Sequence, residues 1–219
     1  MSEEVELQAA EGFVAPELRA EFPGLRLDWL TTPVRAGDSP PEVRRRLGGL
    51  SNRYRGASVV AMRTWPIPRA YRTFFRQIGL DPDTDRIPSE EAAVARLLHG
   101  AFIPSGLVAD ALLIALVETG VPVWALDADA VDPGGLGIRM TASGDRLGSG
   151  EEAVALEPGR LVVADERAVH GLLFGEIAPG HEVGPKTRRA ALFAISVEGV
   201  PRIHCEEALW VCVEVLGAG

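Results

Sequence analysis

The stretch that most constrains the fold runs from residue 102 to residue 139, where one long apolar segment is followed at once by another. The first segment, Leu107 to Glu118, is apolar on nearly all sides, with Asp110 as the lone charge before Glu118. A helix that is apolar all round has to be buried. Gly120 suits the end of this helix, because glycine adopts the left-handed backbone conformation at little cost. Residues 121–126 are typical of a buried strand, so the stretch predicts a buried helix followed by a buried strand.

The flanking segments predict further helices and strands. Pro16 suits the first turn of a helix, where its missing N–H costs nothing, and residues 25–30 alternate like a half-buried strand. Ser89 before two glutamates predicts a helix over residues 90–98. After Arg139 the pattern becomes β, with strands expected over residues 161–164, 169–174, 189–197 and 208–216. Because no repeat or clean linker interrupts the chain, we expect one α+β domain.

Composition restricts the class of protein and its compartment. The chain has 219 residues and is 47% hydrophobic, enough to bury a substantial core in one large domain. Its net charge of −9 argues against general binding of nucleic acid or an acidic membrane by the whole surface, and no DNA partner is expected. With an acidic N-terminus and no apolar run of about 18 residues, we expect a cytoplasmic protein without a membrane span. The two cysteines and four histidines lack ligand spacing, so no metal or cofactor is expected.

An arginine-rich segment departs from this acidic balance. Residues 44–76 contain nine arginines, interleaved with aromatic residues, and not one aspartate or glutamate. Arginine pairs with phosphate groups, and aromatic rings stack on nucleobases. A solvated helix face that pairs with acidic surface elsewhere is the other interpretation. The candidate RNA-binding residues are Arg44, Arg45, Arg46, Arg53 and Arg55.

Short motifs follow one another in a recognisable order through residues 70–200. They are Pro104-Ser105, Ala109-Asp110, Gly120-Val121-Pro122, Leu126-Asp127, Ile138-Arg139, Gly144-Asp145, Ala164-Asp165 and Thr187. This ordered set resembles the B3/B4 module, the editing domain of the phenylalanyl-tRNA synthetase β subunit, and the free-standing proteins that carry only that module. The resemblance implies a single B3/B4-like domain over residues 1–219, with mixed β-sheets flanked by helices. Residues 1–69 would be an N-terminal extension packed on a core module of residues 70–200.

The resemblance also implies a pocket in which a misattached amino acid is hydrolysed from the 3′ end of a tRNA. The family places a histidine, a glutamate and two asparagines around this pocket, and the corresponding residues are Trp124, Phe193, Gly106 and Leu113. Recognition of a tyrosine hydroxyl is therefore not expected. The predicted pocket residues are Ser105, Gly106, Trp124, Arg139, Gly171, Gly175, Thr187 and Phe193.

Asp110 and His170 are the candidate catalytic residues. A carboxylate in an apolar helix has to be paired, so Asp110 either accepts backbone N–H bonds from the Ser105 turn or lines the site. His170 can act as a general base near neutral pH, although a structural role explains a histidine beside a glycine equally well. Arg139 can pair with Asp110 or Asp127, or meet a phosphate. The sequence shows no Ser-His-Asp order and no phosphate-binding glycine motif.

Two functions from different classes fit these observations. The first is a tRNA-linked module, either a trans-acting aminoacyl-tRNA deacylase or an RNA-binding relative. In the deacylase, His170 or Asp110 would orient a water molecule, and N–H groups near Gly171 and Gly175 would stabilise the oxyanion. Arg139 and the arginine-rich segment would meet the terminal phosphates. The alternative is a non-catalytic module that binds a small amino-acid-like ligand or a protein partner in an apolar pocket.

Overall fold

The chain folds into an α+β structure, as predicted. The structure, a computed structural model, describes residues 9–54, 56–132, 134–150 and 152–218. The α-helices in this part of the chain are α1 (Pro16–Glu21), α2 (Pro41–Ser51), α3 (Gly56–Met62), α4 (Pro66–Gln77), α5 (Pro88–His99), α6 (Leu107–Thr119) and α7 (Arg202–Gly217). The strands are β1 (Ala10–Glu11), β2 (Phe13–Val14), β3 (Arg26–Pro33), β4 (Val123–Asp127), β5 (Gly137–Met140), β6 (Arg146–Leu147), β7 (Val154–Ala155), β8 (Leu161–Ala164), β9 (Val169–Leu172) and β10 (Arg189–Ser196).

An antiparallel sheet forms the centre of the molecule, with strand order β1-β3-β10-β4. Strands β3 and β10 pair along their full length, from Arg26 opposite Ser196 to Pro33 opposite Arg189. Every residue of β10 after Arg189 is buried, which places the strand in the core. The N-terminal segment therefore supplies a central strand of the sheet that also holds β4.

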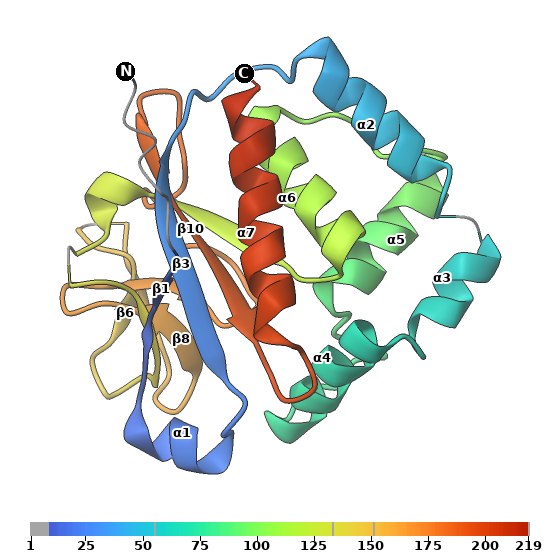
Figure 1. Cartoon of the computed structure of the whole chain (residues 1–219). Helices are drawn as coiled ribbons and strands as arrows, with labels where there is room; N and C mark the ends of the chain where they lie inside the picture. The colour runs from blue at the N-terminus through green and yellow to red at the C-terminus, as the bar shows by residue number, and fades with distance from the viewer. Residues whose placement is uncertain (1–8, 55, 133, 151, 219) are drawn as a thin grey trace.

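A second sheet, of mixed direction, lies on the other side of the central sheet from α2, α5, α6 and α7 (Figure 1). Its strand order is β2-β5-β8-β9-β6-β7. The pairs β2–β5 and β6–β9 run parallel, and the remaining pairs run antiparallel. One sheet is thus antiparallel and the other mixed, with helices along one side of the pair.

The helices α6 and α7 pack side by side next to the central sheet, with α2 and α5 outside them (Figure 1). Helix α6 carries the all-round apolar pattern and ends at Gly120, whose φ of 79° is left-handed. Both features confirm the prediction for this stretch. Among the described helices, none is long and apolar enough to cross a membrane.

The predicted strand over residues 208–216 is wrong, because these residues form the second half of α7. The buried residues of α7 are Cys205, Ala208, Leu209, Cys212, Val215 and Leu216. They recur at intervals of three and four, which is the spacing of one helix face. The intervening residues Trp210, Val211 and Val213 are also apolar, so the run looks continuous and hides the helical period.

Candidate functional site

A groove between α6 and β4 is the candidate site. It consists of two hollows that share Leu112 in their walls. The first, which we call the Trp124 hollow, has a volume of about 410 Å³. Its lining residues are Pro88, Glu91, Leu112, Leu113, Leu116, Pro122, Val123, Trp124, Phe174, Gly175 and Glu176. The second, the Ser105 hollow, has about 340 Å³ and includes Ser105, Gly106, Ala125, Glu182 and Val183. The cavity expected between the Asp110 helix and the Trp124 strand is therefore open.

Trp124 lines the groove and packs against Phe193, which lines neither hollow. Trp124 on β4 is paired in register with Phe193 on β10. Their rings stack, with centroids 5.5 Å apart and an angle of 11° between planes. Phe193 is fully buried behind Trp124, and Leu113 lines the same hollow. Trp124 and Leu113 therefore give this part of the groove an apolar surface, which Phe193 supports from behind.

Phe174 forms part of the wall of the Trp124 hollow and was not identified from the sequence. Its φ is 60°, a left-handed conformation that bulky residues rarely adopt. Its ring lies against Trp124, Tyr71 and Phe75, with centroid distances of 5.7, 5.6 and 5.4 Å. Such a conformation costs about 1–3 kcal/mol and persists only where the surroundings fix it. The neighbouring Gly175 lines the hollow, but its N–H already donates to the Leu172 carbonyl at 2.9 Å.

The charged side chains of the groove are all acidic. Glu91 and Glu176 line the Trp124 hollow, and Glu182 lines the Ser105 hollow. All three are exposed. Among the residues that line the two hollows in the described part of the chain, none is basic. The groove therefore suits a ligand with an apolar body and a positively charged group, and it repels phosphate.

Asp110 is buried and holds a loop beside the groove. Its carboxylate accepts hydrogen bonds from the Ser39 hydroxyl and, at 2.9 Å, from the Ser105 N–H. The Leu107 N–H donates to the Gly37 carbonyl, which joins the same two loops. Both carboxylate oxygens of Asp110 are thus engaged with the loops around residues 37–39 and 105. Of the predicted residues nearby, Ser105 and Gly106 line the Ser105 hollow.

Arg139 and Thr187 are engaged with other residues of the motif set. The Arg139 guanidinium bonds both carboxylate oxygens of Asp145. This hydrogen bond lowers the pKa of Asp145 more than partial burial raises it. The Thr187 hydroxyl donates to Asp127 at 2.6 Å. Neither Arg139 nor Thr187 lines either hollow, so the structure does not bring them to the groove.

His170 lies in a separate, fully buried cluster. Its Nε2 is 2.7 Å from an Asp165 oxygen, and its Nδ1 is 2.9 Å from His181 Nδ1. The following residue, Gly171, pairs with Val163 in the second sheet. His170 and Asp110 share no partner, and neither lines the groove. Their assignment as catalytic residues stays a prediction.

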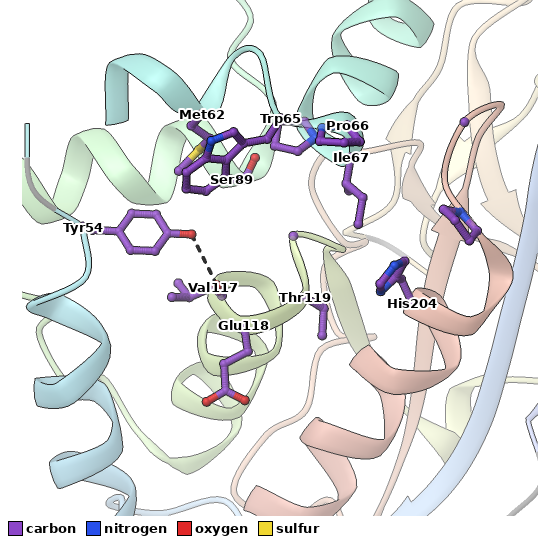
Figure 2. A pocket seen from close by; sticks show the side chains of 14 residues that line it. Tyr54, Met62, Trp65, Pro66, Ile67, Ser89, Val117, Glu118, Thr119 and His204 are labelled. Atoms are coloured by element: carbon purple, nitrogen blue, oxygen red, sulfur yellow. Dashed lines mark hydrogen bonds between the residues drawn. The ribbon is translucent and has the colours of Figure 1, made fainter. Parts of the chain in front are cut away.

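A third hollow, of about 420 Å³, lies where α3, α4, α5, α6 and α7 approach one another (Figure 2). We call it the Trp65 hollow. Its walls include Met62, Trp65 and Ile67 on one side and Val117 on the other. The Tyr54 hydroxyl donates to the Val117 carbonyl across one end, at 3.3 Å. The Trp65 and Trp124 hollows are both lined by residues of α5 and α6, with Ser89 and Val117 in the first and Pro88 and Leu116 in the second.

Four arginines line a fourth hollow, of about 260 Å³, which we call the arginine hollow. Its lining residues are Arg63, Thr64, Arg69, Arg72 and Arg76. The buried Arg72 bonds Glu90 at 2.8 Å and Asp83 at 2.7 Å, and Arg63 bonds Asp83 at 3.0 Å. Arg69 and Arg76 are exposed on the same face of α4. Arg63 and Arg72 are thus paired with carboxylates, whereas Arg69 and Arg76 have no ion pair within 4 Å among the described residues, although Arg76 lies close enough to help lower the pKa of Asp83.

The arginines predicted to bind RNA differ in their surroundings. Arg46 bonds Glu118 at 2.7 Å and Glu214 at 2.9 Å, and the bond to Glu118 raises its pKa. Arg44 lies 4.0 Å from Asp38, and Arg45 and Arg53 are exposed. Arg55 lies outside the described residues. Arg46 therefore matches the interpretation of a face paired with acidic surface.

Comparison with known proteins gives one informative similarity. No protein-family model matches the chain. It is 34% identical over 126 residues to the phenylalanine–tRNA ligase β subunit of Gloeobacter violaceus. The match covers 56% of this chain and 15% of the length of that subunit. The chain therefore has a distant and partial similarity to one subunit of a tRNA-charging enzyme, in agreement with the resemblance of its motifs.

Proposed function

We propose that this chain binds the aminoacyl end of a tRNA and that the α6–β4 groove holds the aminoacyl group. The open Trp124 hollow, with Trp124 in its wall and the buried Phe193 stacked behind it, is the observation that carries the proposal. An aminoacyl ester has a positively charged α-amino group beside a side chain of variable polarity. Glu91 and Glu176 suit the ammonium group, and the aromatic and leucine surface suits an apolar side chain. The similarity to a tRNA ligase subunit supports tRNA as the carrier of the ester.

The apolar lining favours a class of amino acids rather than one. A pocket selects strongly for a hydroxyl group only if it bonds that group, and the replaced positions here offer Trp124, Phe193 and Leu113. One methylene more or less in an apolar pocket changes binding by only about 1–3 kcal/mol. We therefore expect broad acceptance of apolar side chains and little preference for tyrosine over phenylalanine.

The phosphates of the tRNA need a different surface, because carboxylates line the groove. The arginine hollow provides one, with Arg69 and Arg76 exposed on α4. Trp65 lines the Trp65 hollow and directly follows Thr64, which lines the arginine hollow (Figure 2). Its side chain is 42% exposed and can stack on a nucleobase. The proposal thus separates the amino acid from the phosphates by charge.

Hydrolysis of the ester in this groove would use its own carboxylates. Glu91, Glu176 and Glu182 are the titratable residues that line the two hollows in the described chain. A carboxylate can accept a proton from water that attacks an ester carbonyl. In the hydrolytic form of the proposal one of these glutamates acts as the base. Deacylation assays with a panel of mischarged tRNAs, repeated with Glu176→Gln, Glu91→Gln and Glu182→Gln, test this step.

Binding is tested with three forms of one tRNA: aminoacylated, N-acetyl-aminoacylated and uncharged. We expect the aminoacylated form to bind most tightly, because acetylation removes the positive charge that the glutamates attract. Leu113→Trp fills the Trp124 hollow and should abolish the preference without changing the affinity for uncharged tRNA. Leu98→Trp, at a position 78% exposed on α5, is the matched control. Equal affinity of the unmodified protein for all three forms would refute the proposal.

A binding module for a free amino-acid-like ligand is the second candidate, and one observation favours it. The hydroxyl of Ser89 is buried at the Trp65 hollow and has no hydrogen-bond partner among the described residues. A small polar ligand group could satisfy it. Thermal-shift measurements with free amino acids, set beside tRNA binding at two salt concentrations, separate the two candidates. Stabilisation by a free amino acid without tRNA binding would favour this second function.

A further inference from the structure

Four side chains away from the groove form a continuous series of contacts from the interior to the surface. Asp165 Oδ2 lies 2.7 Å from His170 Nε2, and His170 Nδ1 lies 2.9 Å from His181 Nδ1. His181 Nε2 lies 3.2 Å from the Ser149 hydroxyl. The acid and both imidazoles are buried, whereas Ser149 is exposed. The proposed function uses none of these four residues.

The surroundings of Asp165 determine where the protons lie. Its carboxylate accepts backbone N–H bonds from Asp132, Arg167 and Ala168 at 2.6, 2.7 and 2.9 Å. Burial alone would raise the pKa of Asp165, but these bonds and the contact with His170 outweigh it and lower the pKa. Asp165 is therefore ionised, and its oxygen lies 2.7 Å from His170 Nε2, a contact that is attractive when that nitrogen carries a proton, although the N–H is not aligned for a hydrogen bond.

The remaining protons follow from this first assignment. When His170 carries a proton on Nε2 alone, its Nδ1 is an acceptor, so His181 places its proton on Nδ1 and leaves Nε2 free. The free Nε2 accepts the hydrogen of the Ser149 hydroxyl. Burial, followed by the nearby His170, lowers the pKa of His181, while Asp165 and Glu182 act in the opposite direction. His181 is thus a neutral base whose free nitrogen faces an exposed serine.

This arrangement can move the serine proton away from the serine. When His181 Nε2 takes that proton, its Nδ1 proton passes to His170 Nδ1, and the positive charge comes to rest on His170. That imidazolium lies 2.7 Å from the ionised Asp165, which stabilises it. The logic is that of a serine, a histidine and an acid in hydrolases, with a second histidine between base and acid.

The backbone bends around Ser149, which has a glycine on either side. Gly148 and Gly150 have φ of 86° and 72°, whereas Ser149 between them does not have a positive φ. The Gly148 N–H donates to the Val169 carbonyl, which ties the turn to β9 beside His170.

We propose that Ser149 is a nucleophile that accepts an acyl group from small carboxylic esters. Its oxygen forms a bond with the ester carbonyl carbon while its proton passes to His181 Nε2 and the other proton moves on to His170. The tetrahedral intermediate then expels the alcohol, which takes the proton returned through His181, and an acyl-serine remains. Water removes the acyl group by the same sequence, so the acid and the alcohol are the only products. This activity needs neither the groove nor tRNA, so its failure would leave the proposed function standing.

The experiment uses the intact chain, a fluorophosphonate probe and p-nitrophenyl acetate, with the modified residue located by peptide mass spectrometry. Both reagents should modify Ser149, and Ser149→Ala should abolish that modification. His181→Gln should slow it by about 100-fold or more, because it removes the base. Ser143→Ala, at an exposed serine of a nearby turn, is the matched control and should leave the rate unchanged.

The rate of labelling of Ser149 relative to Ser143 in the protein without substitutions tests the proposal even if the His181→Gln variant fails to fold. A faster reaction at Ser149, with a rate that rises as His181 loses its proton, supports the proposal. Equal labelling of Ser149 and Ser143, or a rate unaffected by His181→Gln in a folded variant, overturns it.

Discussion

Phe174 shows how a single residue can break a local rule because its neighbours require it. Its φ of 60° would suit glycine, yet its ring meets those of Tyr71, Phe75 and Trp124. The packing of one large ring against several others outweighs the backbone cost of about 1–3 kcal/mol. The wall of the Trp124 hollow therefore depends on a strained residue held by its aromatic contacts.

Replacement of Phe174 by alanine and by glycine should separate packing from strain. Both variants lose the ring contacts, which should cost about 3–5 kcal/mol. The alanine variant keeps the backbone penalty and the glycine variant does not, so Phe174→Gly should be about 1 kcal/mol more stable than Phe174→Ala. Urea unfolding measures the difference.

Phe75 offers a matched control in helix α4. There glycine should be about 1 kcal/mol less stable than alanine, because a helix interior penalises its flexibility. The same order of stabilities at both positions would show that Phe174 carries no backbone strain.

At the scale of elements, the sequence predicts those whose period is clear and misses those set by distant contacts. Helix α6 has an apolar pattern, a stop at Gly120 and a following strand, and all three are found. Helix α7 was mistaken for a strand because apolar residues also fill its less buried face. Local periodicity cannot show which side of such a segment meets the core.

The candidate site was predictable only in part, for a related reason. The helix and strand that border the groove follow each other in the chain, so their neighbourhood could be expected. Phe174 comes from the turn after β9, and Ser149 and Asp165 reach the two histidines through a fold that no spacing reveals. Side chains brought together by tertiary structure leave no periodic signal in the sequence.

Asp110 provides a test of structural against catalytic roles at the level of a helix and its loop. Asp110→Asn keeps the shape but leaves the Ser39 and Ser105 donors with a weaker acceptor. We expect a loss of about 1.5–3 kcal/mol in the free energy of unfolding. The rate of deacylation of mischarged tRNA per folded molecule should change by less than about twofold, whereas loss of a general base would lower that rate by about 100-fold or more. Unchanged stability together with a large loss of activity would return Asp110 to the catalytic role.

The pairing of Arg139 with Asp145 joins β5 to the following turn and should appear in the pH dependence of stability. The folded pKa of Asp145 lies below 3.8, so the unfolded chain binds more protons as the pH falls. The stabilisation is full above that pH and is lost as the pH drops toward the lowered value. Asp145→Asn should therefore cost about 1 kcal/mol at neutral pH and make acid unfolding less steep. Parallel curves for both proteins below pH 4 would contradict the assignment.

At the scale of the whole molecule, positive and negative side chains are concentrated in separate regions, which the net charge does not show. The net charge is −9, yet an arginine hollow lies on α4 and three glutamates line the α6–β4 groove. Field strength near a surface depends on such local clusters more than on the total. The molecule therefore has one region that attracts phosphate and another that attracts ammonium groups.

The two exposed arginine pairs of the arginine-rich segment allow this distribution to be tested on tRNA. Arg69→Gln with Arg76→Gln removes two charges from the arginine hollow, and Arg45→Gln with Arg53→Gln removes two from the surface at α2. The net change is the same in both double variants. If phosphates occupy the hollow, only the first pair should weaken binding, and the slope of log affinity against log salt should fall by about 1.4, for two single-strand phosphate contacts. Equal losses in both variants would mean that tRNA responds to total charge alone, and a loss confined to the second pair would place the RNA on α2.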